Sequence, residues 1–286
     1  MRSRWIVPAL SASLLALAVS ANAQTSADEY DRSIFDPDRS IIIDNPYLPF
    51  RPGTKLVYKG TAREGSKRIP VGVVSVDTDL VKVIDGVRVR VIYEADYIQG
   101  HLEEAELAFH AQDRDRNVWH FGQLRETYNE EGEFVGGRAW MVGHLEGAKA
   151  GIRMQAQPLQ LGTPAYSQGF APPPFFWDDF AQLVKTGVRN CVPAGCFEEV
   201  AVFDEFEPTK PNAHQLKYYA PGVGNIRVGW KGRGEKQRES LKLVEIVELS
   251  PEEMAEVRAI AREMETRAYT YSSTAPVAGA PGTDGP

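Results

Sequence analysis

The sequence predicts a mainly β fold, an antiparallel meander that forms a sandwich or a curled, barrel-like sheet and carries one C-terminal α-helix. From residue 54 onward, short runs of β-branched and aromatic residues repeat with a period of two, as strands do. Turn residues separate these runs at short intervals, which is typical of antiparallel sheets. Only the stretch after residue 250 changes to the spacing of a helix.

Valine-rich runs mark the strands of the first half. Residues 87–93 alternate Val and Arg, the pattern of a strand with one face in water. Asp85-Gly86 just before it indicates a tight turn after the earlier run at 71–76. Further strands are predicted in this half at 55–59, 102–110, 118–121 and 133–135.

The second half continues the pattern without a break in composition. Its predicted strands lie at 152–156, 183–188, 200–206, 215–219, 225–229 and 240–248. Because no break in composition separates two domains, we interpret 46–249 as a single β domain.

Residues 250–268 are predicted to form the helix. Ser250 as N-cap, Pro251 at the first helical position and Glu253 at the third complete a capping box. A narrow apolar stripe follows at helical spacing: Met254, Val257, Ala261 and Met264. The tail at 269–286 is rich in Ser, Thr, Pro, Ala and Gly and is expected to be disordered.

The first 23 residues have the features of a secretory signal peptide. Arg2 and Arg4 precede an apolar stretch, and the Ala-Asn-Ala triplet at 21–23 is the pattern that a signal peptidase reads. The apolar stretch is shorter than the ~20 residues that a membrane-spanning helix needs. We therefore expect cleavage after residue 23, a flexible arm at 24–45 and a periplasmic or secreted protein.

The charge balance argues against two classes of partner. The chain has 32 Lys and Arg against 39 Asp and Glu, a formal net charge of −7. Nucleic acids and anionic membrane surfaces attract clustered cations, so an acidic chain is a poor candidate to bind either. No later apolar run reaches spanning length, so no membrane span is expected.

The only two cysteines, Cys191 and Cys196, flank a Val-Pro-Ala-Gly turn. In an oxidising compartment such neighbours most simply form a disulfide, worth roughly 2 kcal/mol for so short a loop. A redox-active pair is the alternative, but the spacing is not C-x-x-C.

Four phrases stand out along the chain: NPYLPFRPGT at 45–54, AQDRDRNVWHFG at 111–122, GAKAGI at 147–152 and KYYAPGVG at 217–224. Together they resemble an uncharacterised family of secreted bacterial proteins with a meandering β domain. The resemblance implies the compartment and the fold, and it transfers no catalytic residue. The sequence departs from the family pattern at the cysteine turn and at 172–179, PPPFFWDD, which is unusually rich in proline and aromatic residues.

One candidate site is a loop with the spacing of metal ligands. Asp113, Asp115 and Asn117 alternate like the first ligands of an EF-hand calcium loop. Val118 and Leu124 stand where that loop needs Gly and Glu, so a turn held by Asp and Asn side chains is the better interpretation.

The aromatic cluster Phe175, Phe176 and Trp177 is the most suggestive feature. Three adjacent aromatic residues in a proline-rich loop cannot all face inward by strand alternation. They either cap one end of the sheet or line a mouth for an apolar ligand or partner. His110 and His120 flank the 113–117 turn and are placed to meet across a hairpin, where such residues more often fill strand positions than bind metal.

For function we expect a non-catalytic protein that binds an apolar small molecule or an envelope component, with no cofactor. The alternatives are an envelope-directed hydrolase or lyase and a protein-interaction module without a small ligand. Convergent carboxylates or histidines in a pocket favour the enzyme, and an apolar cavity favours the binding protein. A filled core with a flat aromatic patch favours the interaction module.

Overall fold

The computed structural model describes residues 30–279, so the predicted signal peptide at 1–23 lies outside the described residues. In chain order the elements are a short 3-10 helix η2 (Arg32–Ile34), the strands β1 (Thr54–Glu64), β2 (Lys67–Ile84), β3 (Val87–Ile98), β4 (His101–Gln112), β5 (Val118–Tyr128), β6 (Phe134–Met141), β7 (Lys149–Met154), β8 (Tyr166–Ala171), β9 (Trp177–Val192), β10 (Gly195–Phe206), β11 (His214–Ala220), β12 (Gly224–Lys231) and β13 (Ser240–Glu248), and the helix α1 (Pro251–Ala268).

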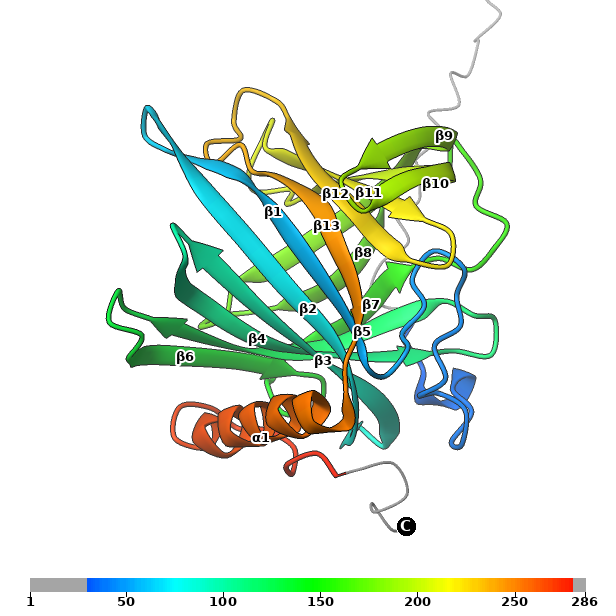
Figure 1. Cartoon of the computed structure of the whole chain (residues 1–286). Helices are drawn as coiled ribbons and strands as arrows, with labels where there is room; N and C mark the ends of the chain where they lie inside the picture. The colour runs from blue at the N-terminus through cyan, green and yellow to red at the C-terminus, as the bar shows by residue number, and fades with distance from the viewer. Residues whose placement is uncertain (1–29, 280–286) are drawn as a thin grey trace, which may run out of the picture.

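The thirteen strands form one antiparallel sheet that closes on itself (Figure 1). The neighbours run β4-β3-β2-β1-β13-β12-β11-β10-β9-β8-β7-β5, and β4 also pairs with β5, which closes a barrel of twelve strands. β6 is an extra strand on the edge of β5. The predicted mainly β fold, with a barrel-like antiparallel sheet and one C-terminal helix, is confirmed.

Most predicted strands are shorter than the observed ones. β13 has the predicted bounds, whereas the run predicted at 71–76 is the middle of an 18-residue strand, β2. Strand pairing on both sides continues β2 through polar residues that carry no apolar pattern. β8 also lacks apolar alternation and is absent from the predicted strands.

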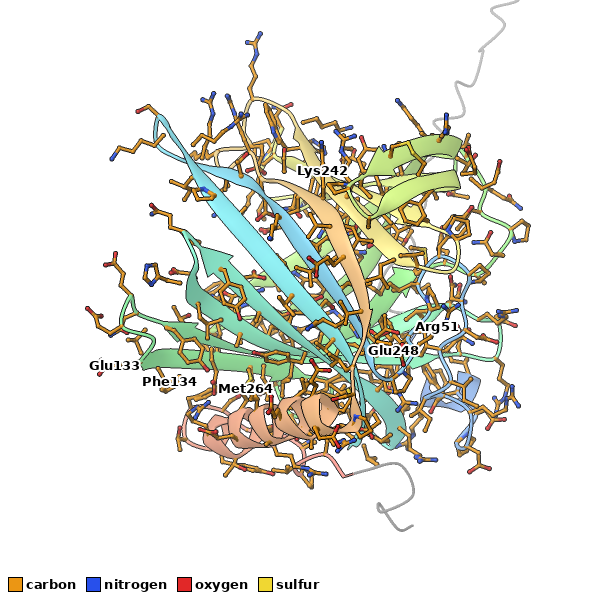
Figure 2. The ribbon with its side chains drawn as sticks, in the orientation of Figure 1. Arg51, Glu133, Phe134, Lys242, Glu248 and Met264 are labelled. Atoms are coloured by element: carbon orange, nitrogen blue, oxygen red, sulfur yellow. A yellow bond between two sulfur atoms is a disulfide. The ribbon has the colours of Figure 1, made fainter. Side chains whose placement is uncertain are left out.

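Side chains alternate between the two faces of the barrel wall. Val89, Val91 and Leu107 share a buried cluster with Met264 of α1, which covers the outside of this part of the sheet (Figures 1 and 2). The residues between them on β3 and β4 therefore face the barrel interior. This alternation places ionisable side chains inside the barrel, as described below.

The segment at 43–50 fills one end of the interior. Ile43 joins a buried cluster with Phe203 and Tyr219, and Tyr47, Leu48 and Phe50 pack against this cluster. The arm predicted at 24–45 includes Ile43, which is 3% exposed in the structure. Single apolar residues anchor this segment, and isolated apolar residues produce no periodic signal in a sequence.

Asn45 ties this segment to the barrel. Its Nδ2 donates hydrogen bonds to the carbonyl oxygens of Arg116 and Gln155, at 2.9 and 3.0 Å. The side chain is fully buried, so these bonds compensate for its loss of water.

The helix begins as predicted. The Ser250 hydroxyl accepts a hydrogen bond from the Glu253 N–H at 3.2 Å, and the Glu253 carboxylate accepts one from the Ser250 N–H at 2.8 Å. This confirms the capping box.

The residues after the helix, 269–279, pack on the barrel; they are the described part of the tail predicted at 269–286. Ala275 and Ala278 are buried, and the Val81 N–H donates to the Gly279 carbonyl at 3.0 Å. Their anchor is an ion pair between Lys82 and Glu265 at 2.7 Å, with both side chains fully buried. The composition of the tail does not reveal this anchor, because both charged partners lie outside the tail.

The carboxylate and the ammonium of this pair each bind the tail as well. Glu265 accepts the Ala278 N–H at 2.6 Å, and Lys82 donates to the Pro276 carbonyl at 2.9 Å. One buried pair therefore holds β2, α1 and the C-terminal segment together.

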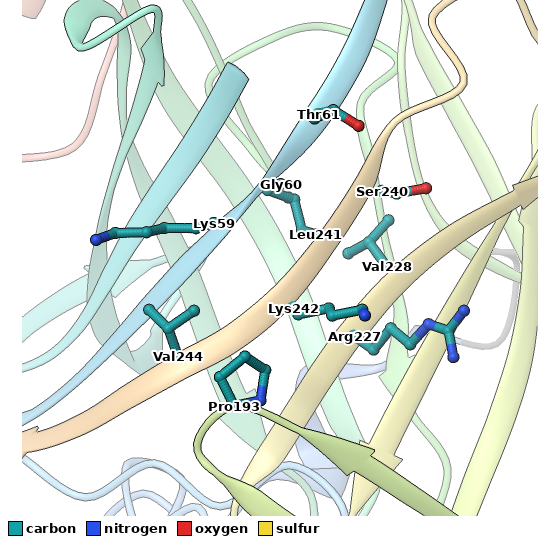
Figure 3. A pocket seen from close by; sticks show the side chains of 10 residues that line it. All are labelled: Lys59, Gly60, Thr61, Pro193, Arg227, Val228, Ser240, Leu241, Lys242 and Val244. Atoms are coloured by element: carbon teal, nitrogen blue, oxygen red, sulfur yellow. The ribbon is translucent and has the colours of Figure 1, made fainter. Parts of the chain in front are cut away.

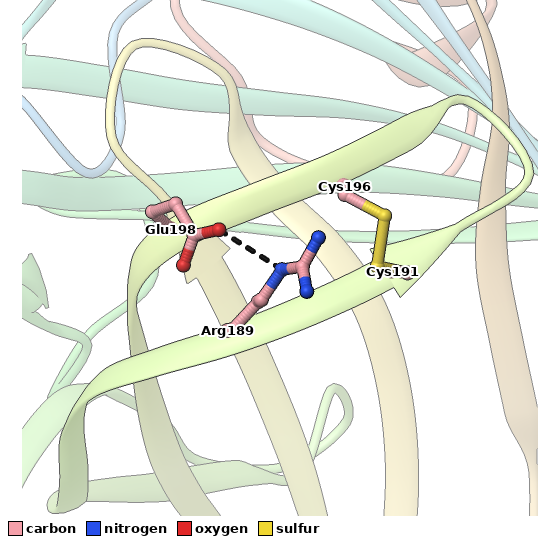
Figure 4. Close-up of a disulfide and its surroundings, with 4 residues drawn as sticks. All are labelled: Arg189, Cys191, Cys196 and Glu198. Atoms are coloured by element: carbon pink, nitrogen blue, oxygen red, sulfur yellow. Dashed lines mark ion pairs between the residues drawn. A yellow bond between two sulfur atoms is a disulfide. The ribbon is translucent and has the colours of Figure 1, made fainter.

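The predicted disulfide joins directly opposed residues of the β9–β10 hairpin, Cys191 and Cys196 (Figure 4). Beside it, an exposed ion pair links Arg189 to Glu198 at 2.9 Å. The turn inside the disulfide docks on β13, where the Ala194 N–H donates to the Leu243 carbonyl at 3.2 Å.

We predict that Lys82→Met or Glu265→Leu alone lowers the free energy of unfolding by about 3–5 kcal/mol, because each leaves one buried charge without its partner. The free energy of unfolding should fall much less in the double variant, because it leaves no unpaired buried charge. Urea unfolding measures both effects, with Arg189→Ala in the exposed pair as a near-neutral control. Equal stability of the single variants and the wild type would contradict the structural role of this pair.

Candidate functional site

Four carboxyl groups of β3 and β4 face the barrel interior. The register places Glu94 opposite Glu106 and Asp96 opposite Glu104. Like charges directly opposite each other in a sheet repel, so this arrangement disfavours full ionisation.

Arg125 on β5 offsets part of this charge. Its guanidinium lies 3.1 Å from Glu104 Oε1 and 2.9 Å from Glu106 Oε2. Burial nevertheless raises the pKa of Glu106 to about 7. Burial and the neighbouring carboxylates raise the pKa of Asp96 to about 8. Part of this acidic array therefore holds protons at neutral pH.

Groups from distant strands share the same interior. Burial raises the pKa of Tyr58 on β1 and of Tyr219 on β11, and the charge of Glu94 on β3 adds to both shifts. No two of the strands β1, β3 and β11 are neighbours in the sheet, so this electrostatic influence acts across the barrel interior.

Glu205 on β10 is the centre of a second polar group. Its carboxylate lies 3.0 Å from Arg153 Nη1 and 3.7 Å from Lys217 Nζ. Burial opposes ionisation, but the charges of Arg153 and Lys217 hold the pKa of Glu205 below its ordinary value. Gln168 and Tyr219 also donate to Glu205 Oε1, at 3.3 and 3.4 Å. Glu205 is thus a buried anion held by four side chains.

His110 and His120 meet across the β4–β5 hairpin, as expected from their positions. Their rings stack with centroids 4.9 Å apart, between Phe50 on one side and Trp140 and Trp177 on the other. Burial lowers the pKa of His120 to about 3, so its ring is neutral at physiological pH. The pair forms part of the packed interior wall.

The Asp113 turn uses its oxygen atoms to hold the chain. Asp113 accepts hydrogen bonds from the backbone and side-chain nitrogens of Asn117 and from Trp119 Nε1, each at 2.8 Å. Asn117 Oδ1 accepts the Ala156 N–H, and Asp115 is exposed. Among residues 30–279, no group of three or more His, Cys, Asp or Glu side chains is arranged to hold a metal ion.

The three aromatic residues of the β8–β9 turn lie in different environments. Phe175 is buried against Trp140 and under the Arg138 guanidinium, which lies 5.0 Å from its ring. Phe176 is 71% exposed, with a left-handed φ of 58°. Trp177 is half-buried and packs on Trp140 at 5.3 Å. Two of the rings therefore pack as a cap, and one projects into solvent.

A groove of about 410 Å³ opens on the outer face of the barrel, between β12, β13, β1 and the tip of the β9–β10 hairpin (Figure 3). Along the groove, β12 and β13 pair at two register positions only, Arg227 with Lys242 and Val228 with Leu241. β11 and β12, by comparison, pair along the whole of β11. The seam between β12 and β13 therefore spreads open.

The floor of the groove is apolar and its edges are cationic. Val228 and Leu241 belong to the buried core, and Val244 and Pro193 form the walls. Three basic side chains, two hydroxyls and a glycine complete the lining: Lys59, Arg227, Lys242, Thr61, Ser240 and Gly60. No pattern in the sequence predicts this site, because the lining residues lie on four segments that are far apart in the chain.

Gly60 allows the close approach of β1 and β13 beside the groove. A Cβ atom at this position would lie 1.7 Å from the Ser240 carbonyl oxygen, so any other residue would force the two strands apart. The width of the groove at this end therefore depends on a glycine.

No family model and no curated protein match the chain. Two solved structures are similar over 71% of this chain and 99% of their own. One is assigned as an exported protein with a YmcC-like fold from Bacteroides fragilis NCTC 9343, with 10% identity and a TM-score of 0.34. The other is assigned as a lipoprotein from Parabacteroides distasonis ATCC 8503, with 11% identity and a TM-score of 0.33.

A likeness of this size carries no argument about ligand or activity. The resemblance of the four sequence phrases to a secreted family stays an expectation. Within residues 30–279, no helix combines the length and the apolar character needed to cross a membrane.

We predict that stability falls as the pH rises from about 6.5 to 8.5. The folded protein keeps protons on Glu106 and Asp96 up to a pKa of about 7 and about 8, whereas an unfolded carboxyl group loses its proton near pH 4. Folding is therefore linked to proton uptake, so the free energy of unfolding falls as the pH rises. This dependence on pH ends above about pH 8, where the folded protein has also lost these protons. Below about pH 6.5 the buried histidines act with the opposite sign, because only the unfolded state protonates them.

Urea unfolding at several pH values within this window measures the slope of the free energy of unfolding against pH. Asp96→Asn should flatten it, because the amide does not titrate. Stability that is constant or rises over the window would contradict the assignment of protonated interior acids.

We predict that Trp177→Ala lowers the free energy of unfolding by about 3 kcal/mol, because it removes a large packed ring. Phe176→Ala should change stability by less than about 0.5 kcal/mol, because its ring is in solvent. Thermal unfolding separates the two residues. A Trp177→Ala protein of unchanged stability that loses ligand binding would instead support a ligand mouth at this turn.

Proposed function

We propose that this chain is an exported, non-catalytic protein that holds the apolar part of a small molecule or envelope component in the groove between β12 and β13. The observation that carries the proposal is that the groove is open to solvent and reaches core residues, Val228 and Leu241. Its volume of about 410 Å³ lies within the range of small-molecule sites, roughly 300–1,000 Å³.

The groove is preformed on one side. Pro193 lies in the turn that the Cys191–Cys196 disulfide closes, and the hydrogen bond from Ala194 to Leu243 fixes that turn on β13. A wall that is already ordered loses little conformational freedom when a ligand binds. The disulfide also supports export, because such bonds persist in oxidising compartments.

An envelope-directed hydrolase is the second candidate, and the interior carboxyl groups favour it. Asp179 of β9 precedes Ala181, the register partner of Glu205, by two residues, so both carboxyl groups face the same side of the sheet. Burial raises the pKa of Asp179 to about 6, while that of Glu205 is lowered. Two carboxyl groups with separated pKa values suit acid–base chemistry. The four side chains around Glu205 occupy its oxygens, however, which favours a structural role.

The test is to fill the groove. We predict that Val244→Trp weakens binding of the neutral apolar dye N-phenyl-1-naphthylamine by about tenfold or more, because the new ring occupies the site. Fluorescence titration measures the affinity. Val83→Trp is the matched control, because Val83 is 44% exposed and lies outside the groove lining.

The thermal midpoint of Val244→Trp should stay near that of the wild type. Equal dye affinity of Val244→Trp and wild type would overturn the groove as the binding site. Hydrolysis of an envelope glycan or ester that stops in Glu205→Gln but continues in Val244→Trp would favour the enzyme.

A further inference from the structure

A row of three cations crosses the groove on adjacent strands. Lys59 of β1 is the register partner of Lys242 of β13, and Lys242 is the register partner of Arg227 of β12. All three line the groove (Figure 3). Direct register partners lie on the same face of a sheet, so the three side chains leave neighbouring positions of one face.

This row has no anionic partner in the described part of the chain. None of the ion pairs among residues 30–279 includes one of these three residues; the Arg227 guanidinium instead lies 4.9 Å from the Tyr218 ring. Some other cations of the sheet face acids: Arg189 pairs with Glu198, and Lys231 pairs with Asp204 at 2.7 Å. A chain with more acidic than basic residues leaves this row unpaired.

Unpaired like charges in consecutive register positions destabilise a sheet, because each repels the next. A bound anion removes that repulsion. The row spans two strand spacings, about 10 Å in all, which is the size of a headgroup and much shorter than a polymer. Nucleic acids are typically bound through about 6–10 phosphate contacts, more than three side chains supply.

Figure 3 shows how the three side chains divide the groove. Lys242 and Arg227 extend in the same direction on one side, and Lys59 extends in the opposite direction on the other. A guanidinium beside an ammonium suits a phosphate, since Arg donates two parallel hydrogen bonds and Lys adds a point charge. The Thr61 and Ser240 hydroxyls are further donors in the same lining.

We propose that the row recognises the phosphate of an anionic lipid whose acyl part lies on the apolar floor of the groove. The inference rests on the proposed function, because it concerns the same groove, and it names the ligand class as a phosphate-bearing amphiphile. Exposed Glu245 and Glu248 follow on the same strand and repel a flat anionic membrane. The geometry therefore fits one lipid molecule held by its headgroup.

The experiment titrates the protein with two soluble short-chain lipids, dihexanoyl phosphatidic acid and the zwitterionic dihexanoyl phosphatidylcholine, by displacement of N-phenyl-1-naphthylamine. Inorganic phosphate is titrated by calorimetry. We expect phosphatidic acid to bind about tenfold or more tightly than phosphatidylcholine, and added salt to weaken only the former. Free phosphate should bind far more weakly, because it lacks the acyl contacts.

The variants Lys242→Gln and Arg227→Gln should each weaken the binding of phosphatidic acid about tenfold, because each removes a charged donor to the phosphate. Lys242→Arg should retain binding, because it keeps the charge. Lys185→Gln, at an exposed position of β9, is the matched control. Without ligand, Lys242→Gln should unfold at a higher temperature than the wild type, because it relieves repulsion within the row.

The outcomes separate the two proposals. Loss of dye binding in Val244→Trp, together with unchanged phosphatidic acid affinity in both charge variants, would overturn the lipid phosphate and leave the groove as an apolar site. Free phosphate binding as tightly as phosphatidic acid would overturn the lipid as the ligand. Wild-type dye affinity in Val244→Trp would overturn both.

Discussion

Closure of the sheet between β4 and β5 constrains the rest of this structure. An open sheet leaves a row of unpaired backbone groups on each edge, whereas a closed one pairs both edges of every strand in the ring. Closure also gives the sheet an inside and an outside. The alternation along β3 and β4 then sends valines and leucines towards α1 and carboxyl groups into the barrel. The helix and the polar interior thus follow from the same geometry.

The seam between β12 and β13 is one of two places in the closed sheet, with the β7–β8 seam, where neighbouring strands pair at two register positions. β13 pairs with β12 at two positions, and the carbonyl of Leu243 then accepts its hydrogen bond from Ala194 of the hairpin tip. The tip therefore substitutes for the missing length of β12. The disulfide that closes the tip also helps to position Pro193, which forms a wall of the groove. The same seam brings Arg227 beside Lys242 and exposes core residues beneath them.

In the part of the chain that the structure describes, charged side chains are paired inside the barrel but unpaired in the groove. Inside the barrel, Arg125 and Arg153 each pair with carboxylates, and burial leaves some acids protonated, so the array is close to self-compensated. On the outer face the row at Lys59, Lys242 and Arg227 has no such compensation among the described residues. A self-compensated cluster stabilises a fold by itself, whereas an uncompensated one is a cost that a ligand can remove. This difference is why we place the ligand outside the barrel.

Local chemistry in the sequence determined the strand class, the helix and the disulfide. Period-two alternation, the Ser250 capping box and the short cysteine turn each act between residues that are close in the chain, so their outcome can be read there. The packing of Ile43 and Ala278 could not be predicted in this way, because both residues are buried by partners distant in sequence. Barrel closure and the inward placement of Glu94 and Glu106 required the strand register. The groove is the extreme case, because positions 59, 227 and 242 become neighbours only when β1, β13 and β12 pair, and pairing across such separations is decided by the folded sheet alone.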